Sequence, residues 1–299
     1  MPVIGFLGSA SAAGFAPQLA GFHRGLAEAG FTEGRNLAIE YRWADDQHDR
    51  LPKLAADLVR RQVAVIHASG PPAALAAKAA TSTIPIVFSV GFDPVAAGLV
   101  ASLSHPGGNA TGFTLYIGAL VAKKLEMLRE MVPNASHLGM LVNPTTPSAK
   151  LDAAEMETAA RAQGQQVRIL NASTDQEIEA AFDSLARQRA NAILVGTDTF
   201  YFNRRDHLVA QAARHRIPVI YYSREFVTAG GLMSYGANIP DVYRQTAIYV
   251  VRVLKGEKPA DLPVLQPTRF ELVINRKTAK ALGLTIPQSI LLRADEVIE

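Results

Sequence analysis

The sequence of 299 residues contains no cysteine, which excludes disulfide bonds, thiolate metal sites and cysteine nucleophiles. An excess of charge of one sign is also lacking, because 30 basic and 27 acidic residues leave a formal net charge of +3. The basic residues are dispersed, whereas nucleic-acid binding normally needs a basic stripe and a recognisable reading element. We therefore expect no nucleic-acid partner. Hydrophobic residues make up 48% of the chain, which is typical of a globular protein.

Long hydrophobic runs are missing as well. No stretch reaches the roughly 18 uncharged apolar residues that indicate a transmembrane helix. Met1 and Pro2 lead directly into the apolar segment 3–7, so no export leader is recognisable. Two interpretations remain open on these grounds: a cytoplasmic protein, or an exported protein whose leader has been removed.

The common signatures of enzymes are absent too. The sequence has no G-x-G-x-x-G, no G-x-x-x-x-G-K-[ST], no G-x-S-x-G and no H-E-x-x-H motif. No two of the seven histidines are four residues apart, so a metal site on a helix is not expected. His67 ends a predicted strand, where a structural role is favoured over catalysis. We predict no catalytic residue, no metal site and no cofactor.

Short β-branched segments alternate with longer amphipathic segments along the chain. The predicted strands are 3–7, 36–42, 63–67, 85–89, 137–142, 166–170, 191–195, 217–221 and 231–235. The predicted helices are 15–29, 48–61, 72–81, 94–103, 118–131, 148–163, 174–189, 203–215, 239–255 and 276–282. This alternation favours the α/β class, with parallel sheets covered by helices on both faces.

An internal repeat is the most informative pattern. Segments 4–9, 64–70 and 84–89 resemble, in the same order, segments 138–143, 192–198 and 217–223, at offsets of 134, 128 and 133 residues. The repeat predicts two similar lobes, each a Rossmann-like, doubly wound sheet. Gly107–Gly112 is a turn-rich segment and the predicted junction. The tail after 256 matches no part of the repeat; it carries a predicted strand at 270–274, and it favours more than one crossing between lobes.

Small polar and aromatic residues follow most predicted strands. Ligands of open α/β sheets bind beyond the carboxyl ends of the strands, so these residues are the candidate ligand-binding set. The alternative interpretation of any single member is helix capping, which uses the same residue types. The set comprises Ser9, Ser11, Ser69, Gly70, Phe92, Asp93, Tyr116, Asn143, Thr145, Thr197, Asp198, Phe200, Tyr222 and Ser223.

Roles within this set follow from chemistry. Hydroxyl and backbone N–H groups suit a ligand carboxylate, a carboxylate suits an ammonium or hydroxyl group, and aromatic rings suit an apolar side chain. The corresponding predictions are Ser9, Ser11, Ser69 and Gly70 for the carboxylate, Asp93 or Asp198 for the ammonium group, and Tyr116, Phe200 or Tyr222 for the side chain.

Several motifs spread over nearly the whole chain resemble one family. They are 4–7, 22–26 with 30–31, 34–36, 40–42, 84–88, 93–95, 106–112, 234–236, 272–275, 278–279, 282–283 and 286–287. In combination, they resemble the ABC-transporter substrate-binding proteins that include tryptophan- and tyrosine-binding members. The segment 197–200 matches the second-lobe binding loop of that family only loosely.

The resemblance implies a type I periplasmic-binding-protein fold, in which the chain crosses three times between two lobes. The expected lobes are 1–112 plus about 238–267, and 113–237 plus about 268–299, with hinges near 112–114, 236–238 and 267–270. It also implies capture of a small ligand between the lobes and its delivery to ABC permease subunits. The expected ligand is an amino acid or a small aromatic acid. The expected protein is a periplasmic or extracytoplasmic monomer that meets the membrane only through the permease.

Two other functions compete with transport. The same two-lobe fold serves as the ligand-sensing effector domain of cytoplasmic repressors, although this chain opens on a strand and not on a helix-turn-helix. A two-lobe α/β enzyme is the second alternative, and the missing nucleotide loops and cysteine count against it.

Overall fold

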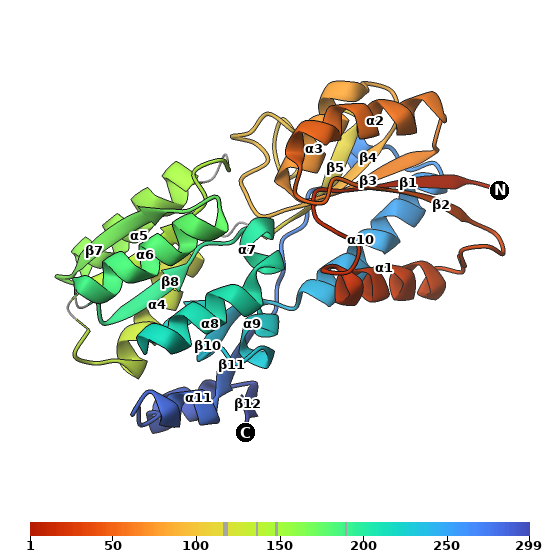
Figure 1. The fold of residues 1–299 in the computed structure, drawn as a ribbon. Coiled ribbons are helices and arrows are strands. Elements are labelled where there is room, and N and C mark those ends of the chain that lie inside the picture. Colours follow the sequence, from red (N-terminus) through yellow and green to blue (C-terminus); the bar gives the residue numbers. More distant parts are fainter. Residues whose placement is uncertain (116–118, 136, 147–148, 189) are drawn as a thin grey trace. The chain divides into compact units, whose positions relative to one another are not determined.

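The computed structural model describes residues 1–115, 119–135, 137–146, 149–188 and 190–299 (Figure 1). The chain forms two compact units: unit 1 comprises Met1–Tyr116 and Ile239–Thr268, and unit 2 comprises Ile117–Asn238 and Arg269–Glu299. The chain therefore passes between the units three times. Each unit is built on a sheet of mainly parallel strands, which confirms the predicted α/β class.

Unit 1 has a five-stranded parallel sheet in the order β2-β1-β3-β4-β5. Its strands are β1 (Val3–Gly8), β2 (Ala38–Trp43), β3 (Val65–Ser69), β4 (Ile86–Val90) and β5 (Ala110–Thr114). Its helices are α1 (Ala16–Glu28), α2 (Leu51–Arg60), α3 (Pro71–Ala80) and α10 (Ile239–Leu254), with short turns of 3-10 helix at η1 (His48–Arg50) and η2 (Pro259–Asp261). Helices α1 and α10 lie side by side on one face of the sheet, and α2 and α3 cover the other (Figure 1).

Unit 2 has a seven-stranded sheet in the order β12-β11-β10-β9-β8-β6-β7, in which only the β10–β11 pair is antiparallel. Its strands are β6 (His137–Val142), β7 (Gln166–Asn171), β8 (Ala192–Val195), β9 (Val219–Tyr221), β10 (Met233–Ala237), β11 (Phe270–Asn275) and β12 (Glu296–Ile298). Its helices are α4 (Ala119–Met131), α5 (Ala149–Ala162), α6 (Asp175–Arg187), α7 (Thr199–Asn203), α8 (Arg205–His215), α9 (Arg224–Thr228), α11 (Arg276–Ala281) and α12 (Gln288–Arg293).

The two sheets reproduce the internal repeat. Strands β2-β1-β3-β4-β5 of unit 1 have the same order as β7-β6-β8-β9-β10 of unit 2. The early glycine of the repeat has the same steric reason in both units. A Cβ atom at Gly5 would lie 3.0 Å from Leu58 of α2, and one at Gly139 would lie 2.8 Å from Leu185 of α6. Each glycine therefore allows a leucine to pack directly on the strand.

A local sequence signal explains where helix α6 begins. Thr174 caps this helix by accepting the backbone N–H of Glu177 at 3.2 Å, and the Glu177 carboxylate accepts the backbone N–H of Thr174 at 3.1 Å. This reciprocal capping box supplies partners for N–H groups that the first turn leaves unpaired. The predicted apolar face is buried, with Ile178 and Phe182 fully covered.

Two predictions for the segment before unit 2 are wrong. Residues 94–98 form turns instead of starting a helix that runs to 103. The Asp93 carboxylate accepts the N–H groups of Val95 and Ala96, at 2.9 and 3.2 Å, and thereby stabilises the turn. The turn predicted at Gly107–Gly112 ends before residue 110, because Ala110–Thr114 forms strand β5.

Other elements differ in smaller ways. The helix predicted at 203–215 is α8, and the short helix α7 that precedes it was not predicted. The tail contains the predicted strand and helix as β11 and α11, and also α12 and β12, which the sequence patterns did not indicate. Glycines near two predicted hinges have a packing reason: a Cβ atom at Gly112 would lie 2.1 Å from the Phe88 carbonyl oxygen, and one at Gly236 would lie 1.8 Å from that of Tyr222.

Helices α1 and α10 approach each other unusually closely. A Cβ atom at Gly21 would lie 2.1 Å from the carbonyl oxygen of Pro240, and one at Gly25 would lie 2.1 Å from that of Arg244. Two glycines four residues apart share one helix face, so the backbone of α10 rests directly on α1. This contact ties the residues that follow the second crossing to the first helix of unit 1.

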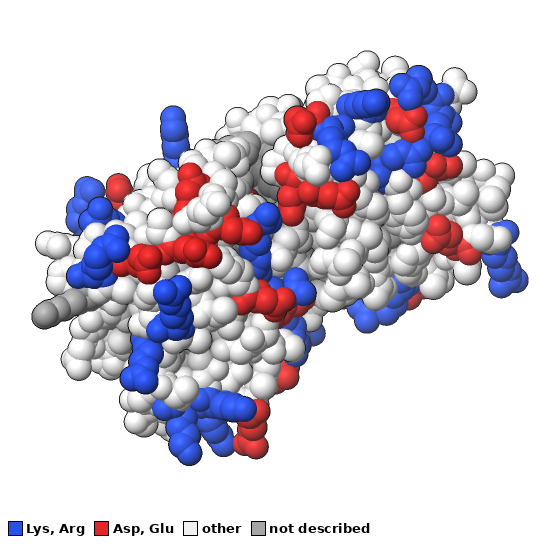
Figure 2. Space-filling model, viewed as in Figure 1, with Lys and Arg blue, Asp and Glu red and all other residues white. Residues whose placement is uncertain are grey.

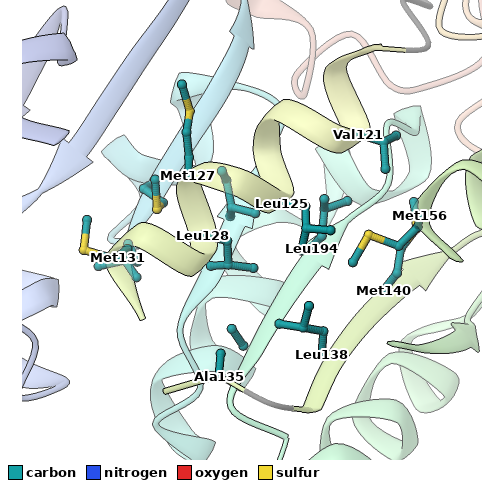
Figure 3. Packing of buried hydrophobic residues seen from close by; sticks show 14 of the residues in the cluster. Val121, Leu125, Met127, Leu128, Met131, Ala135, Leu138, Met140, Met156 and Leu194 are labelled. Atoms are coloured by element: carbon teal, nitrogen blue, oxygen red, sulfur yellow. The ribbon is translucent and has the colours of Figure 1, made fainter. Parts of the chain in front are cut away.

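The core of unit 2 is rich in methionine. Five of the six methionines of the sequence belong to one buried cluster beside α4 and the sheet, at positions 127, 131, 140, 156 and 233. Figure 3 labels Met127, Met131, Met140 and Met156 among leucines of α4, β6 and β8. The cluster beneath α2 and α3 of unit 1 contains no methionine and is built from alanine, leucine, isoleucine, valine and phenylalanine.

Candidate functional site

The structure places the described candidate residues of unit 1 at the carboxyl ends of its strands. Ser9 directly follows β1, Ser69 ends β3, and Phe92 and Asp93 follow β4. In a parallel sheet these ends share one edge, so the residues lie on the same side of unit 1. Tyr116 lies outside the described residues.

The serine hydroxyls of unit 1 have partners inside the unit. Ser69 Oγ lies 2.5 Å from the hydroxyl oxygen of Tyr243 on α10, and Ser9 Oγ donates to the Ser69 carbonyl oxygen at 3.2 Å. Both serine side chains are fully buried. Ser11 Oγ accepts the N–H of Gly14 at 3.4 Å in the loop before α1. The contact of these serines with a ligand carboxylate stays a prediction. A ligand that bound them would have to compete with the hydrogen bonds just described.

Gly70 has a backbone role that no other residue type fills easily. Its φ of +93° lies in the region that favours glycine, and it is the N-cap residue of α3. Its N–H donates to the Ser89 carbonyl oxygen at 2.9 Å, so this group is already used within unit 1. Two neighbours after β4 are also engaged: Phe92 belongs to the core cluster with a 1% exposed side chain, and Asp93 stabilises the turn described above.

The candidates of unit 2 form a connected polar network at the ends of β6, β8 and β9. Asp198 Oδ1 accepts the Asn143 side-chain N–H at 3.3 Å. Asn143 Oδ1 in turn accepts the backbone N–H and the hydroxyl of Thr145, at 3.1 and 2.8 Å. The Tyr222 hydroxyl donates to the Asp198 carbonyl oxygen at 2.6 Å. The structure thus brings four of the predicted residues into one network, with Asp198 at its centre.

Asp198 combines this central position with helix capping. Its Oδ1 atom accepts the N–H groups of Phe200 and Tyr201, at 2.6 and 3.4 Å, at the start of α7. Thr197, which precedes it, is half-buried. Burial raises the pKa of Tyr222 well above its usual value, and the neighbouring Asp198 charge adds to this, so Tyr222 is a neutral hydrogen-bond donor.

Aromatic rings and a second carboxylate surround the network. Phe200 is buried, and the Arg204 guanidinium lies 3.9 Å from the centre of its ring, a cation–π contact. The Ser223 hydroxyl donates to the Glu225 carboxylate. The arrangement offers neutral donors and acceptors with one central carboxylate, which suits binding of a small polar ligand.

The sequence patterns missed two aromatic residues near the candidate residues of unit 1. Tyr243 lies within the amphipathic pattern of α10, and nothing there distinguishes it from a core residue until its contact with Ser69 is seen. Trp43 is the single tryptophan of the sequence and the last residue of β2. Its position one residue beyond the predicted strand 36–42 was the available signal.

Other functional classes find no support among the described residues. His67 is fully buried between aromatic rings; burial lowers its pKa to about 3, and its Nδ1–H donates to the Val87 carbonyl oxygen at 3.0 Å. No group of three or more potential metal ligands occurs in the part of the chain described. Within that part no helix has the length and apolar character to cross a membrane. On the face in Figure 2, basic and acidic side chains are interspersed and form no basic stripe.

Comparison with known proteins gives matches over nearly the entire chain. A family model described as ABC transporter substrate binding protein matches residues 8–298. A tyrosine-binding protein of Clostridioides difficile is 29% identical over 264 residues, which cover 88% of this chain and 76% of that protein.

Two solved structures, each 28% identical and covering 99% of both chains, share the fold. One is a conserved domain protein from Vibrio cholerae, with a TM-score of 0.93, and the other is an ABC domain from Streptococcus pneumonia in complex with L-Trp, with a TM-score of 0.92. The similarities therefore extend over both units.

Proposed function

Because this chain belongs to the ABC transporter substrate-binding protein family, whose members are binding proteins and not enzymes, we propose that it binds an amino acid or a small aromatic acid for import. The ligand class is supported by the relatives, of which one is a tyrosine-binding protein and another was solved with L-Trp. The proposed partners are the ligand and ABC permease subunits. The proposed protein is a monomer that works in the periplasm or another extracytoplasmic space.

The observation that carries this proposal is the polar network around Asp198, which links residues that follow three strands of unit 2, β6, β8 and β9. Asp198 is the proposed acceptor of the ligand ammonium group. The N–H groups and hydroxyls near Ser9 and Ser11 are the proposed donors to its carboxylate. A Kd of 1 μM corresponds to about −8 kcal/mol, which a few charge-assisted hydrogen bonds and one buried ring supply.

Ligand contacts contributed by both units would couple binding to conformation. A ligand held by both units stabilises the closed arrangement more than the open one, and this difference in affinity shifts the population. We propose that the permease recognises the closed form. Small-angle scattering with and without a bound ligand tests this step, which requires a smaller radius of gyration in the bound state.

Titration calorimetry tests the ligand class. L-Tyrosine, L-tryptophan, L-leucine and phenylacetate are titrated into the full chain, and at least one aromatic compound is expected to bind with one-to-one stoichiometry and no turnover. At a free ligand concentration 100 times Kd, the protein gains about 2.7 kcal/mol of stability, which a thermal melt detects. Steady conversion of any of these compounds contradicts the proposal, as does the absence of binding to all of them.

The matched variant for this test is Asp198→Asn. Asparagine caps helices as well as aspartate does, so α7 is retained while the charge is lost. We expect binding of the amino acid to weaken by roughly 1.5–3 kcal/mol, the contribution of a hydrogen bond to a charged group. Binding of phenylacetate, which has no ammonium group, is the control and changes little. Unchanged affinity for the amino acid would restrict Asp198 to its capping role.

A further inference from the structure

We propose that Trp43, at the carboxyl end of β2, is the surface of unit 1 on which the aromatic ring of the ligand stacks, and that it sets the preference for aromatic over aliphatic side chains. This inference rests on the proposed function and makes its ligand site more specific. It is carried by the position of the indole ring, by its partial exposure and by the engagement of the other candidate rings.

Trp43 lies beside the loop that carries two predicted ligand-binding serines. It is paired in register with Gly8, the last residue of β1, and Ser9 follows directly. The backbone continues this pairing beyond the strands, because the N–H of Ala44 donates to the Gly8 carbonyl oxygen and that of Asp46 to the Ser9 carbonyl oxygen, each at 2.9 Å. A group that hydrogen-bonds near Ser9 is thus close to the indole ring.

Gly8 provides the space that the indole ring occupies. A Cβ atom at Gly8 would lie 2.3 Å from Cε3 and Cζ3 of Trp43, so the six-membered part of the indole lies over the glycine. Neighbouring rings hold it there: Phe6 at 5.1 Å, Phe15 at 6.0 Å and Tyr41 at 6.5 Å between centroids. Phe6 and Tyr41 are paired two residues earlier along the strands, so they support the indole from the interior of the sheet.

The indole ring remains half-buried despite these three neighbours, and it is the last side chain of its strand. The two described rings that the sequence favoured are more enclosed. Tyr222 is buried and its hydroxyl is used by Asp198, and Phe200 is buried with one face covered by the Arg204 guanidinium. Trp43 therefore has a partly accessible aromatic surface at the strand ends, held in a fixed orientation.

Physical chemistry links such a surface to selectivity. A stacked aromatic pair contributes roughly two- to tenfold in affinity beyond the apolar area that it buries, and an aliphatic side chain gains only the area. Loss of the indole ring should consequently weaken binding of L-tyrosine by about tenfold or more, and should weaken an aliphatic competitor less.

Calorimetric titration of L-tyrosine into four proteins tests the inference: the wild type, Trp43→Leu, Trp43→Phe and Phe31→Leu. We expect the Kd to rise at least about tenfold in Trp43→Leu and by less than about threefold in Trp43→Phe, which keeps a ring. Phe31→Leu is the matched control, because it removes a half-buried ring from the same unit, in the segment between α1 and β2. Its Kd should stay within about twofold of the wild-type value, and L-leucine competition should show lower selectivity only in Trp43→Leu.

The fluorescence of the wild-type protein provides a second readout, because Trp43 is its only tryptophan. Its emission should change on titration with L-tyrosine, with the same Kd as calorimetry. Unchanged emission at calorimetric saturation would overturn the inference even if Trp43→Leu fails to fold, and so would an equal loss in Trp43→Leu and Phe31→Leu. Absence of L-tyrosine and L-tryptophan binding to the wild type would instead refute the aromatic ligand class of the proposed function, and the inference with it.

Discussion

Unit 1 and unit 2 have the same strand order but different side chains at equivalent strand ends. The repeat offsets place Asn143 of unit 2 where unit 1 has Ser9, and Asp198 where unit 1 has Gly70. The serine and glycine of unit 1 use backbone groups and a short hydroxyl, whereas the amide and carboxylate of unit 2 build a side-chain network. One scaffold thus carries two kinds of polar groups at its strand ends, and Asp198, the proposed acceptor of the ligand ammonium group, belongs to unit 2.

The helix pairs that flank the two sheets also differ in what lies between the helices. Helices α1 and α10 meet at Gly21 and Gly25, where the missing side chains let the backbone of α10 contact α1 directly. Helices α4 and α5 instead enclose Lys124; burial lowers the pKa of this lysine to about 8, and the nearby Asp152 and Glu155 carboxylates oppose the shift. Close packing of backbones has little tolerance for added atoms, so unit 1 is expected to be the unit more sensitive to small substitutions.

The largest expected effect breaks the close contact in unit 1. In Gly21→Ala, the added methyl group meets the Pro240 carbonyl oxygen, so α10 must move away from α1. We expect a loss of about 3 kcal/mol in the free energy of unfolding, the upper range for overpacking. Urea unfolding followed by Trp43 fluorescence measures the change in unit 1.

The reverse substitution at the preceding position, Ala20→Gly, is the control. Ala20 is exposed on the same helix, and Ala20→Gly should cost about 1 kcal/mol through helix propensity alone. At a free position, Gly→Ala would be stabilising by the same amount. A more stable Gly21→Ala protein would therefore refute the close approach of α1 and α10.

The second prediction concerns a buried histidine that unit 2 lacks. The repeat places Val195 of β8 where β3 has His67, so His67→Val gives unit 1 the residue of unit 2. Burial lowers the pKa of His67 to about 3 in the folded state, and the unfolded chain takes up the proton near pH 6.5. The unfolded state therefore binds more protons between these values, and the wild type loses stability as the pH falls through this window.

Unfolding by urea at pH 7 and pH 5 measures this effect. From the pKa difference, His67 alone contributes a loss of about 2 kcal/mol between pH 7 and pH 5. The His67→Val protein should lack this part of the pH dependence, whatever its stability at pH 7. Equal slopes in the two proteins would show that His67 is not kept neutral by its surroundings.

Periodicity and spacing predicted most of the architecture. The repeat of strands 4–9, 64–70 and 84–89 was visible because buried parallel strands need continuous apolar segments, and their order was preserved in both units. Segment 94–103 was mispredicted because Pro94 and its apolar successors fit a helix start, whereas the Asp93 carboxylate closes a turn. Strand β5 was missed because its glycine, Gly112, reads as a turn residue until its contact with Phe88 is known.

The candidate site was predictable by position and less so by contacts. Strand ends located Asn143, Asp198 and Tyr222 because small polar residues there are conspicuous in an apolar chain. Hydrogen bonds between residues far apart in sequence, such as Ser69 with Tyr243, depend on how α10 returns to unit 1. Trp43 was missed for a related reason, because its place over Gly8 follows from the register of β1 and β2.

The smallest expected effect compares the two N-caps that follow the equivalent strands β3 and β8. Gly70 caps α3 by backbone conformation alone, and Asp198 caps α7 with its side chain. Gly70→Ala places a Cβ atom at a φ of +93° and should cost about 1–2 kcal/mol, whereas Asp198→Ala removes a capping carboxylate and should cost about 1 kcal/mol. Without ligand, Asp198→Asn keeps the cap and should differ from the wild type by only a few tenths of a kcal/mol.

Urea unfolding monitored by circular dichroism ranks the three variants. If Asp198→Asn is instead as unstable as Asp198→Ala, the charge of Asp198 contributes to folding, and the distinction between a backbone cap in unit 1 and a neutral side-chain cap in unit 2 is wrong.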